Sequence, residues 1–210
     1  MKLVSSDYID LKMYEPAMRH LIDTYIRADE SEVISNFDDM SLIQLIVERG
    51  ATAVDTLPKS IRENKETVAE TIENNVRKLI IDETPVNPKY YDRMSELLDA
   101  LINQRKQQAI NYGEYLAKIV DLTKQVSNPA NSATYPAAID TPAKRALYDN
   151  LEKNENLATA INADIRLTKK DDWRGNKFKE KEVRNAIRKH LTDDGMVDLI
   201  FDLVRSQHEY

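Results

Sequence analysis

The stretch from Asn64 to Asn111 constrains the fold of this chain most, because it holds two long amphipathic helical patterns joined by a short turn. The first pattern places apolar residues on one helical stripe, namely Val68, Ile72, Val76, Leu79 and Ile80. The second pattern does the same with Tyr91, Met94, Leu97, Leu98, Leu101 and Ile102. Asn87 followed by Pro88 supplies an N-cap and a first-turn proline for the second helix. We therefore expect an antiparallel helical hairpin over residues 64–111, whose solvated face carries Glu66, Glu70, Glu73 and Lys78.

The rest of the chain extends this pattern, and the sequence predicts an all-α multi-helix bundle of about nine helices. Only four of the 210 residues are glycine, and strong helix formers occur throughout. Ser41 and Gln44 form the pattern of a capping box, and Gly50 is placed to end the helix that follows. Thr141 before Pro142 repeats the cap and first-turn proline. A third long helix begins at Tyr112, and we expect it to be kinked near Gly113 from the helix before it.

The segment from Ser127 to Asp140 has two prolines, clusters of small residues and no helical period, which is typical of a boundary between lobes. We divide the chain accordingly into a leading helix over residues 1–40, a central helical core over 41–127 and a C-terminal helical lobe over 141–210. A chain of this length folds as one domain or as two small lobes.

Charge is distributed unevenly along the chain. The net charge is −6, yet the segment from Ile165 to Leu191 has ten Lys or Arg residues against four acids. This segment therefore carries a local charge of +6, and the remainder carries −12. Such asymmetry predicts an anionic partner for the last quarter of the chain, whereas the acidic remainder argues against a nucleic-acid binder over its whole length.

The candidate contact residues are basic and aromatic. On the functional interpretation the only tryptophan and the cations after it anchor a protein partner or nucleic acid: Trp173, Arg174, Lys177, Lys181, Arg184 and Arg188. On the structural interpretation Trp173 fills the core of the C-terminal lobe and the lysines form a solvated face. Of the neighbours Tyr90 and Tyr91, one must point away from the buried stripe, where an exposed tyrosine would be an interface residue.

The sequence offers little catalytic chemistry. The glycines lie too far apart for a phosphate-binding loop, and the absence of cysteine excludes a thiolate metal site or nucleophile. Asp55, Glu63 and Lys65 match the letters of a metal-dependent nuclease, but they flank the start of a helix instead of a strand edge. We expect no catalytic residue, bound cofactor or metal, and keep a cryptic nuclease as the enzyme alternative. No apolar run approaches the length of a membrane span, and a reducing, cytoplasmic setting is compatible with the composition.

Long blocks of the chain resemble the C-terminal region of the R subunit of type I restriction-modification enzymes. The blocks are YEPAMRHLIDTYIRADESEVIS, LIVERGATAVDTLP, VAETIENNVRKLIIDETPVNPKYYDRMSELLDALI, TPAKRALYDNL, DDWRGNKFKEKEVRNAI and the SQHEY tail. The resemblance covers nearly the whole chain.

The resemblance implies a larger cytoplasmic protein with a nuclease domain and two ATP-driven, helicase-like motor domains that require Mg²⁺. Such a subunit docks on a methyltransferase core of modification and specificity subunits, and cleaves unmethylated foreign DNA after translocation. None of the family's nuclease or ATPase motifs falls on this sequence, so neither ATP nor Mg²⁺ is assigned to a residue here. Residues 1–40 would then connect to the motor domains. We expect a non-catalytic module that assembles with the methyltransferase core and guides DNA, with a free-standing helical adaptor as the alternative.

Overall fold

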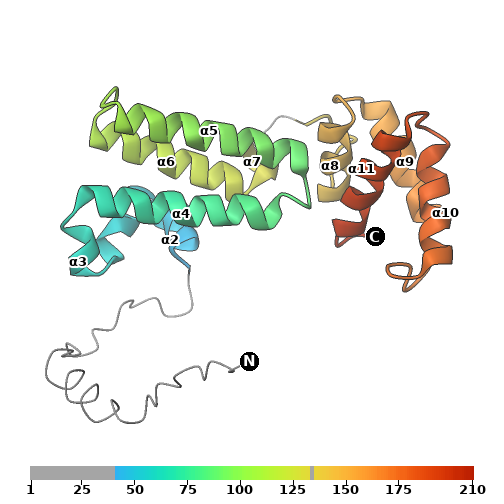
Figure 1. The fold of residues 1–210 in the computed structure, drawn as a ribbon, viewed down its shortest axis with the longest axis horizontal. Helices are drawn as coiled ribbons and strands as arrows, with labels where there is room; N and C mark the ends of the chain where they lie inside the picture. The colour runs from blue at the N-terminus through green and yellow to red at the C-terminus, as the bar shows by residue number, and fades with distance from the viewer. Residues whose placement is uncertain (1–40, 133–134) are drawn as a thin grey trace, which may run out of the picture. The chain divides into compact units, whose positions relative to one another are not determined.

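A computed structural model describes residues 41–132 and 135–210, and these residues form helices and turns without a strand. The all-α fold predicted from the sequence is therefore confirmed (Figure 1). The predicted leading helix over residues 1–40 lies outside the described residues. No helix in the described part is long and apolar enough to cross a membrane. The helices in chain order are α2 (Leu42–Arg49), the 3-10 helix η2 (Gly50–Thr56), α3 (Lys59–Arg62), α4 (Lys65–Glu83), α5 (Pro88–Lys106), α6 (Tyr112–Ser127), α7 (Pro129–Ser132), α8 (Pro142–Asn150), α9 (Glu155–Thr168), α10 (Lys177–Arg188) and α11 (Asp194–Ser206).

The predicted hairpin is formed by α4 and α5, which pack against each other. Asn64 caps α4 by accepting hydrogen bonds from the backbone N–H groups of Glu66 and Thr67. Asn87 caps α5 through the backbone N–H of Tyr90, and Pro88 occupies the first turn. The two caps satisfy backbone donors that a helix start leaves without partners. The signals read from the sequence at residues 64 and 87 thus set where both helices begin.

Helix α6 is not a kinked continuation of α5, as the sequence had suggested, but a separate helix that packs against both α4 and α5. The chain reverses because Gln108 adopts a left-handed backbone conformation with φ of 55°. Asn111 then caps α6 by accepting the backbone N–H of Glu114 at 2.9 Å. Gly113 lies in the first turn of α6 and makes no bend.

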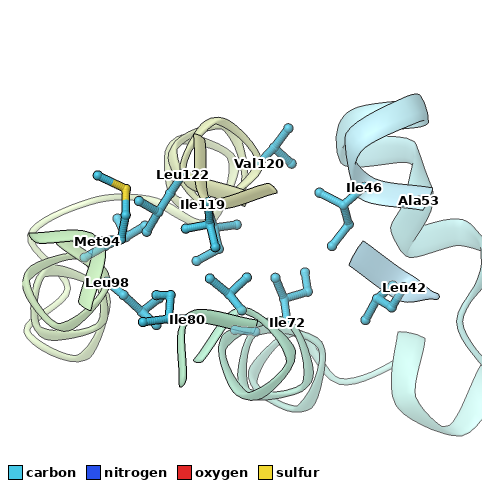
Figure 2. Packing of buried hydrophobic residues seen from close by; sticks show 14 of the residues in the cluster. Leu42, Ile46, Ala53, Ile72, Ile80, Met94, Leu98, Ile119, Val120 and Leu122 are labelled. Atoms are coloured by element: carbon cyan, nitrogen blue, oxygen red, sulfur yellow. The ribbon is translucent and has the colours of Figure 1, made fainter. Parts of the chain in front are cut away.

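The hydrophobic side chains of α2 to α6 meet in one cluster, which we call the N-terminal cluster (Figure 2). The predicted stripes supply most of it, with Val68, Ile72, Val76, Tyr91 and Met94 all buried. The capping box of Ser41 and Gln44 starts α2, as predicted, and Gly50 ends it with a φ of 65° that favours glycine. Helix α2 places three buried side chains over α4 and α6: Leu42, Leu45 and Ile46.

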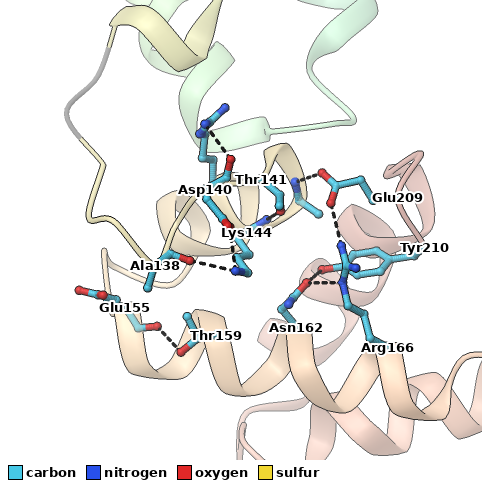
Figure 3. A network of polar contacts seen from close by, with 12 residues as sticks. Ala138, Asp140, Thr141, Lys144, Glu155, Thr159, Asn162, Arg166, Glu209 and Tyr210 are labelled. Atoms are coloured by element: carbon cyan, nitrogen blue, oxygen red, sulfur yellow. Dashed lines mark hydrogen bonds and ion pairs between the residues drawn. The ribbon is translucent and has the colours of Figure 1, made fainter.

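A second group of buried residues, from Ile139 to Tyr210, forms the C-terminal cluster on α8 to α11. Its packing is reinforced by polar contacts from the tail of the chain (Figure 3). The hydroxyl of Tyr210 donates to Oδ1 of Asn162 at 2.7 Å, and both residues are buried. The carboxylate of Glu209 accepts the guanidinium of Arg166 at 3.0 Å and the backbone N–H of Ala143 at 2.9 Å. The tail thereby ties α8 to α9.

The two clusters are separated in sequence between Val126 and Ile139, yet both belong to one compact unit. Polar side chains connect them. The amide of Asn87 donates to Asp149 at 2.8 Å and accepts from Asn150 at 2.9 Å. Asp149 also accepts the hydroxyl of Tyr135 at 2.9 Å, and Gln207 donates to the backbone carbonyl of Val86 at 2.6 Å. The cap of α5 is therefore also a joint between the clusters.

Several turns use side chains where glycine would be less strained. Besides Gln108, the residues Glu152, Lys153 and Asp172 have positive φ values of 55°, 60° and 53°. An L-residue in this conformation costs roughly 1 kcal/mol or more.

Candidate functional site

The candidate site is a surface at the start of α10, which we call the Phe178 surface. It consists of Lys177, Phe178 and Lys181, which lie within the first two turns of α10. Leu167 and Phe178 each expose 84% of their surface, more than the other large exposed hydrophobic side chains of the described residues. Isolated exposed apolar residues are ordinary, but an aromatic ring of this exposure within one helical turn of two unpaired lysines is a candidate contact surface.

Local structure fixes this surface. Helix α9 ends at Thr168, and α10 starts after Asn176, whose side chain accepts the backbone N–H groups of Phe178 and Lys179. Lys170, in the loop, pairs with Glu182 of α10 at 2.8 Å. Phe178 and Glu182 lie one helical turn apart on α10.

Half of the ten cations of the basic segment are paired with acids within the molecule. Arg184 pairs with Asp198, Arg188 with Asp194 at 2.8 Å, and Lys189 with Asp164 at 3.7 Å. Arg184 also lies over the ring of Phe201, 4.2 Å from its centroid. The predicted contact residues Arg184 and Arg188 are thus engaged in ion pairs that connect α10 with α11.

Lys177 and Lys181 differ from these arginines. Both are exposed, and neither side chain makes an ion pair or hydrogen bond to a described residue. Lys169 is half-buried and likewise has no such partner there. These three lysines are the cations of the segment that are available to a ligand.

Trp173 is not a surface contact, and the prediction that it touches a partner is wrong. Its side chain is 2% exposed and packs edge-on against Phe201, with ring centroids 6.0 Å apart. The indole Nε1 is buried without a hydrogen-bond partner. Burial of the large indole closes the C-terminal cluster beneath the loop before α10, which agrees with the structural interpretation of this residue.

Arg174 is exposed, but its donors are used within the molecule. It donates to the backbone carbonyls of Arg205, at 2.8 Å, and of Gln207. Its guanidinium lies 5.0 Å from the centroid of the Trp173 ring. Arg174 therefore fastens the loop to the end of α11, where carbonyl groups have no helical partner.

The expectation that one of Tyr90 and Tyr91 is exposed is also wrong. Their exposed fractions are 7% and 4%. Tyr91 follows the predicted stripe and donates to the carbonyl of Val126 at 3.4 Å, while Tyr90 donates to the carbonyl of Gln125 at 2.8 Å. Both flanks of α5 are covered, because α6 packs on the helix and α8 packs near its start. Burial, and then the charge of Glu83, raises the pKa of Tyr91 above its usual range.

A buried charge cluster lies in the hairpin, where the sequence predicted a solvated face. Glu73 is 6% exposed and accepts two hydrogen bonds from Arg105, at 2.9 and 3.2 Å. The hydroxyl of Tyr115 donates to the same carboxylate at 2.9 Å, and Glu66 is a second partner of Arg105. The guanidinium is 5.5 Å from the centroid of the Tyr115 ring. The prediction for Glu73 is therefore wrong, whereas Glu66 and Glu70 are exposed as expected.

The electrostatics of this cluster hold its charges in place. Burial, followed by the charge of Glu73, raises the pKa of Tyr115, so this hydroxyl stays a donor. Burial lowers the pKa of Arg105, but the hydrogen bonds that its guanidinium donates to Glu66 and Glu73 outweigh this effect, and the pKa is raised. The guanidinium and the hydroxyl of this cluster are both hydrogen-bonded to the carboxylate. Such complete pairing is typical of a structural network and not of a reactive group.

The residues of the nuclease alternative each make a separate contact within the molecule. The backbone carbonyl of Asp55 accepts a hydrogen bond from Arg62, and Glu63 pairs with Lys59 at 3.7 Å. The ammonium of Lys65 lies 5.2 Å from the centroid of the Tyr112 ring. Among residues 41–132 and 135–210 there is no group of three or more metal-ligating side chains.

A cleft of about 580 Å³ lies at the start of α5, next to the joint between the clusters. It is lined by both acids and cations, including Lys89, Arg93, Glu96 and Glu152. This mixture favours neither an anion nor a cation. Comparisons with protein families, curated proteins and solved structures find no match to this chain.

Proposed function

We propose that this chain is the helical C-terminal module of the R subunit of a type I restriction-modification enzyme. Its own task is assembly with the methyltransferase core of modification and specificity subunits, together with guidance of DNA. In this proposal catalysis belongs to the nuclease and motor domains of the whole subunit, which would bring ATP and Mg²⁺.

The observation that carries the assembly role is the Phe178 surface. Phe178 is 84% exposed on α10 next to Lys177 and Lys181, and neither lysine has a partner among the described residues. Aromatic anchors with a polar rim are typical of protein interfaces. The sequence block DDWRGNKFKEKEVRNAI, which contributes to the resemblance, contains Lys177, Phe178 and Lys181.

The arrangement of the remaining blocks is compatible with this role. The longest block spans α4 and α5, and TPAKRALYDNL spans α8. Together they contain Asn87, Asp149 and Asn150, which connect the two clusters. A module of this kind presents its docking surface from a well-ordered scaffold instead of a flexible arm.

The proposal is tested by mixing the purified chain with the modification and specificity subunits of the same system and measuring complex formation by isothermal titration calorimetry. We expect a complex with a dissociation constant in the micromolar range or below. No binding to the core would overturn the assembly role. The native sequence upstream of residue 1 separates the proposal from a free-standing adaptor, since a Walker motif is expected there.

A further inference from the structure

We infer that a pocket in the loop between α9 and α10 binds a carboxylate group, with the indole N–H of Trp173 as a hydrogen-bond donor. The pocket has a volume of about 420 Å³, within the range of roughly 300–1,000 Å³ that is usual for ligand sites. It is lined by residues 169–174 and by Tyr210. Binding here does not depend on the proposed assembly role, because no residue of the Phe178 surface lines the pocket.

The indole N–H points to a ligand because it is buried and unpaired. Trp173 is 2% exposed, and its Nε1 has no hydrogen-bond partner among the described residues. Buried donors are nearly always hydrogen-bonded, since a donor removed from water without a new acceptor destabilises the fold. Nε1 is the only polar atom of the indole, and Trp173 lines the pocket. We therefore assign an acceptor atom of a ligand in the pocket as the partner of this donor.

The cations around the pocket favour an acceptor that carries negative charge. Lys170 is already paired with Glu182 at 2.8 Å. Arg174 uses guanidinium N–H groups to bind two backbone carbonyls at the end of α11. Lys169 lines the pocket and has no partner among the described residues. Its ammonium group is therefore available to a ligand that also accepts the indole N–H.

Two acids limit the negative charge that the ligand can carry. Asp171 and Asp172 also line the pocket, and neither carboxylate is paired with a cation of the described residues. A phosphate group, with a charge of about −1.5 to −2 at pH 7, would be repelled by both. A carboxylate carries a single charge and has two acceptor oxygens, one for the indole N–H and one for Lys169. A carboxylate thus fits the pocket better than a phosphate does.

Contacts within the loop hold the pocket in place before a ligand binds. The ammonium of Lys179 donates to the backbone carbonyl of Asp171 at 2.6 Å. The backbone N–H of Asn176 donates to the carbonyl of Trp173 at 3.3 Å, and the indole packs against Phe201. Donors whose positions are already fixed lose little conformational freedom on binding, which favours affinity.

The contact can be measured directly because the chain has a single tryptophan. The whole chain is labelled with ¹⁵N, so that its spectrum contains one indole N–H cross-peak. Sodium acetate is titrated at constant ionic strength, with sodium chloride as the balance, and sodium phosphate is titrated in the same way. A neutral-ended peptide with one glutamate side chain is titrated as well, to distinguish a free acid from a protein side chain.

Two variants test the cation that the ligand would meet. Lys169→Met removes the free ammonium group of the pocket. Lys78→Met is the matched control, because Lys78 is an exposed lysine of α4 outside the pocket. Thermal unfolding checks that both variants fold.

We expect acetate to move the indole cross-peak downfield in a saturable way, because the N–H then donates to a charged acceptor. Phosphate should move it less at equal concentration. Lys169→Met should weaken acetate binding by about three- to fivefold, as expected for a partly exposed ion pair, and Lys78→Met should bind acetate like the wild type. Tighter binding of the peptide than of acetate would identify the ligand as a protein side chain, and weaker binding would identify it as a free acid.

A cross-peak that acetate and the peptide both leave in place would overturn the inference, and the proposed assembly role would be unaffected. A larger response to phosphate than to acetate would overturn the assignment to a carboxylate. Equal weakening by Lys169→Met and Lys78→Met would show that acetate responds to net charge and not to the pocket.

Discussion

The N-terminal and C-terminal clusters bury polar groups in different ways. The N-terminal cluster encloses a charged carboxylate and a guanidinium, Glu73 and Arg105, and satisfies them with Tyr115. The C-terminal cluster encloses a neutral pair, Asn162 and Tyr210, and keeps its charges outside on α10. The first cluster therefore uses charge to fix its own helices. The second leaves part of its charge available to other molecules.

The largest expected effect comes from breaking the buried pair. Glu73→Gln removes the charge that faces Arg105 and leaves a buried guanidinium compensated only by the exposed Glu66, so we expect a loss of about 3 kcal/mol in the free energy of unfolding. Urea denaturation followed by circular dichroism measures it. Glu70→Gln, on the exposed face of the same helix, is the control and should change little. A loss of less than about 1 kcal/mol for Glu73→Gln would show that the pair does not hold the hairpin.

Substitution of Asn87, which joins the two clusters, should give the next largest loss in the free energy of unfolding. Asn64→Ala removes only a helix cap and should cost about 1 kcal/mol. Asn87→Ala removes a cap and also the amide that Asp149 and Asn150 contact, so the cost should rise to about 2 to 3 kcal/mol. Urea denaturation measures the loss in the free energy of unfolding for both variants. Equal costs for the two caps would mean that the contacts between clusters contribute nothing.

A pair of tyrosines compares the two interiors directly. Tyr115→Phe removes a hydroxyl that donates to a charged carboxylate, for which we expect a loss of about 2 kcal/mol. Tyr210→Phe removes a hydroxyl that donates to a neutral amide oxygen, and here about 1 kcal/mol is expected. If Tyr210→Phe proved the more destabilising, the interior of the C-terminal cluster would depend on polar contacts more than that of the N-terminal cluster.

The smallest effect concerns pH at the surface between α9 and α10. The hydrogen bond from His190, followed by the nearby charge of Lys189, holds the pKa of Asp164 below its usual value of 3.8. A carboxyl with a lowered folded pKa stabilises the protein above its unfolded pKa, and this stabilisation is lost as the pH falls through the folded value. The difference in unfolding free energy between wild type and Asp164→Asn should therefore be present at pH 6 and close below about pH 3.8. A difference that stayed constant across this range would contradict the assignment.

The starts of the helices can be predicted from the sequence better than the buried charged residues can. Caps at Asn87 and Thr141 could be predicted because a side-chain acceptor before a first-turn proline acts locally. Residue type alone predicts a solvated Glu73, whereas its side chain is buried. Its position, four residues after the buried Ala69 and seven before the buried Ile80, lies at the edge of the stripe. Its partner Arg105 is 32 residues away, and only packing of the hairpin brings them together.

At the candidate site, too, long-range contacts decide what the sequence alone does not show. The charge of the segment from Ile165 to Leu191 was visible in the sequence, and so was the candidacy of Lys177 and Lys181. Which cations are neutralised depends on acids of other helices, such as Asp198 and Asp194 of α11. Phe178, in the first turn of α10, is 84% exposed although it is aromatic.

The left-handed residues in the turns have a practical consequence for engineering. Gln108 closes the turn between α5 and α6 with a side chain where glycine would relax the backbone. Lys153 does so after α8. Changes at these positions would adjust thermal tolerance while leaving both hydrophobic interiors and the Phe178 surface intact. They are therefore suitable starting points for a more stable variant of the chain.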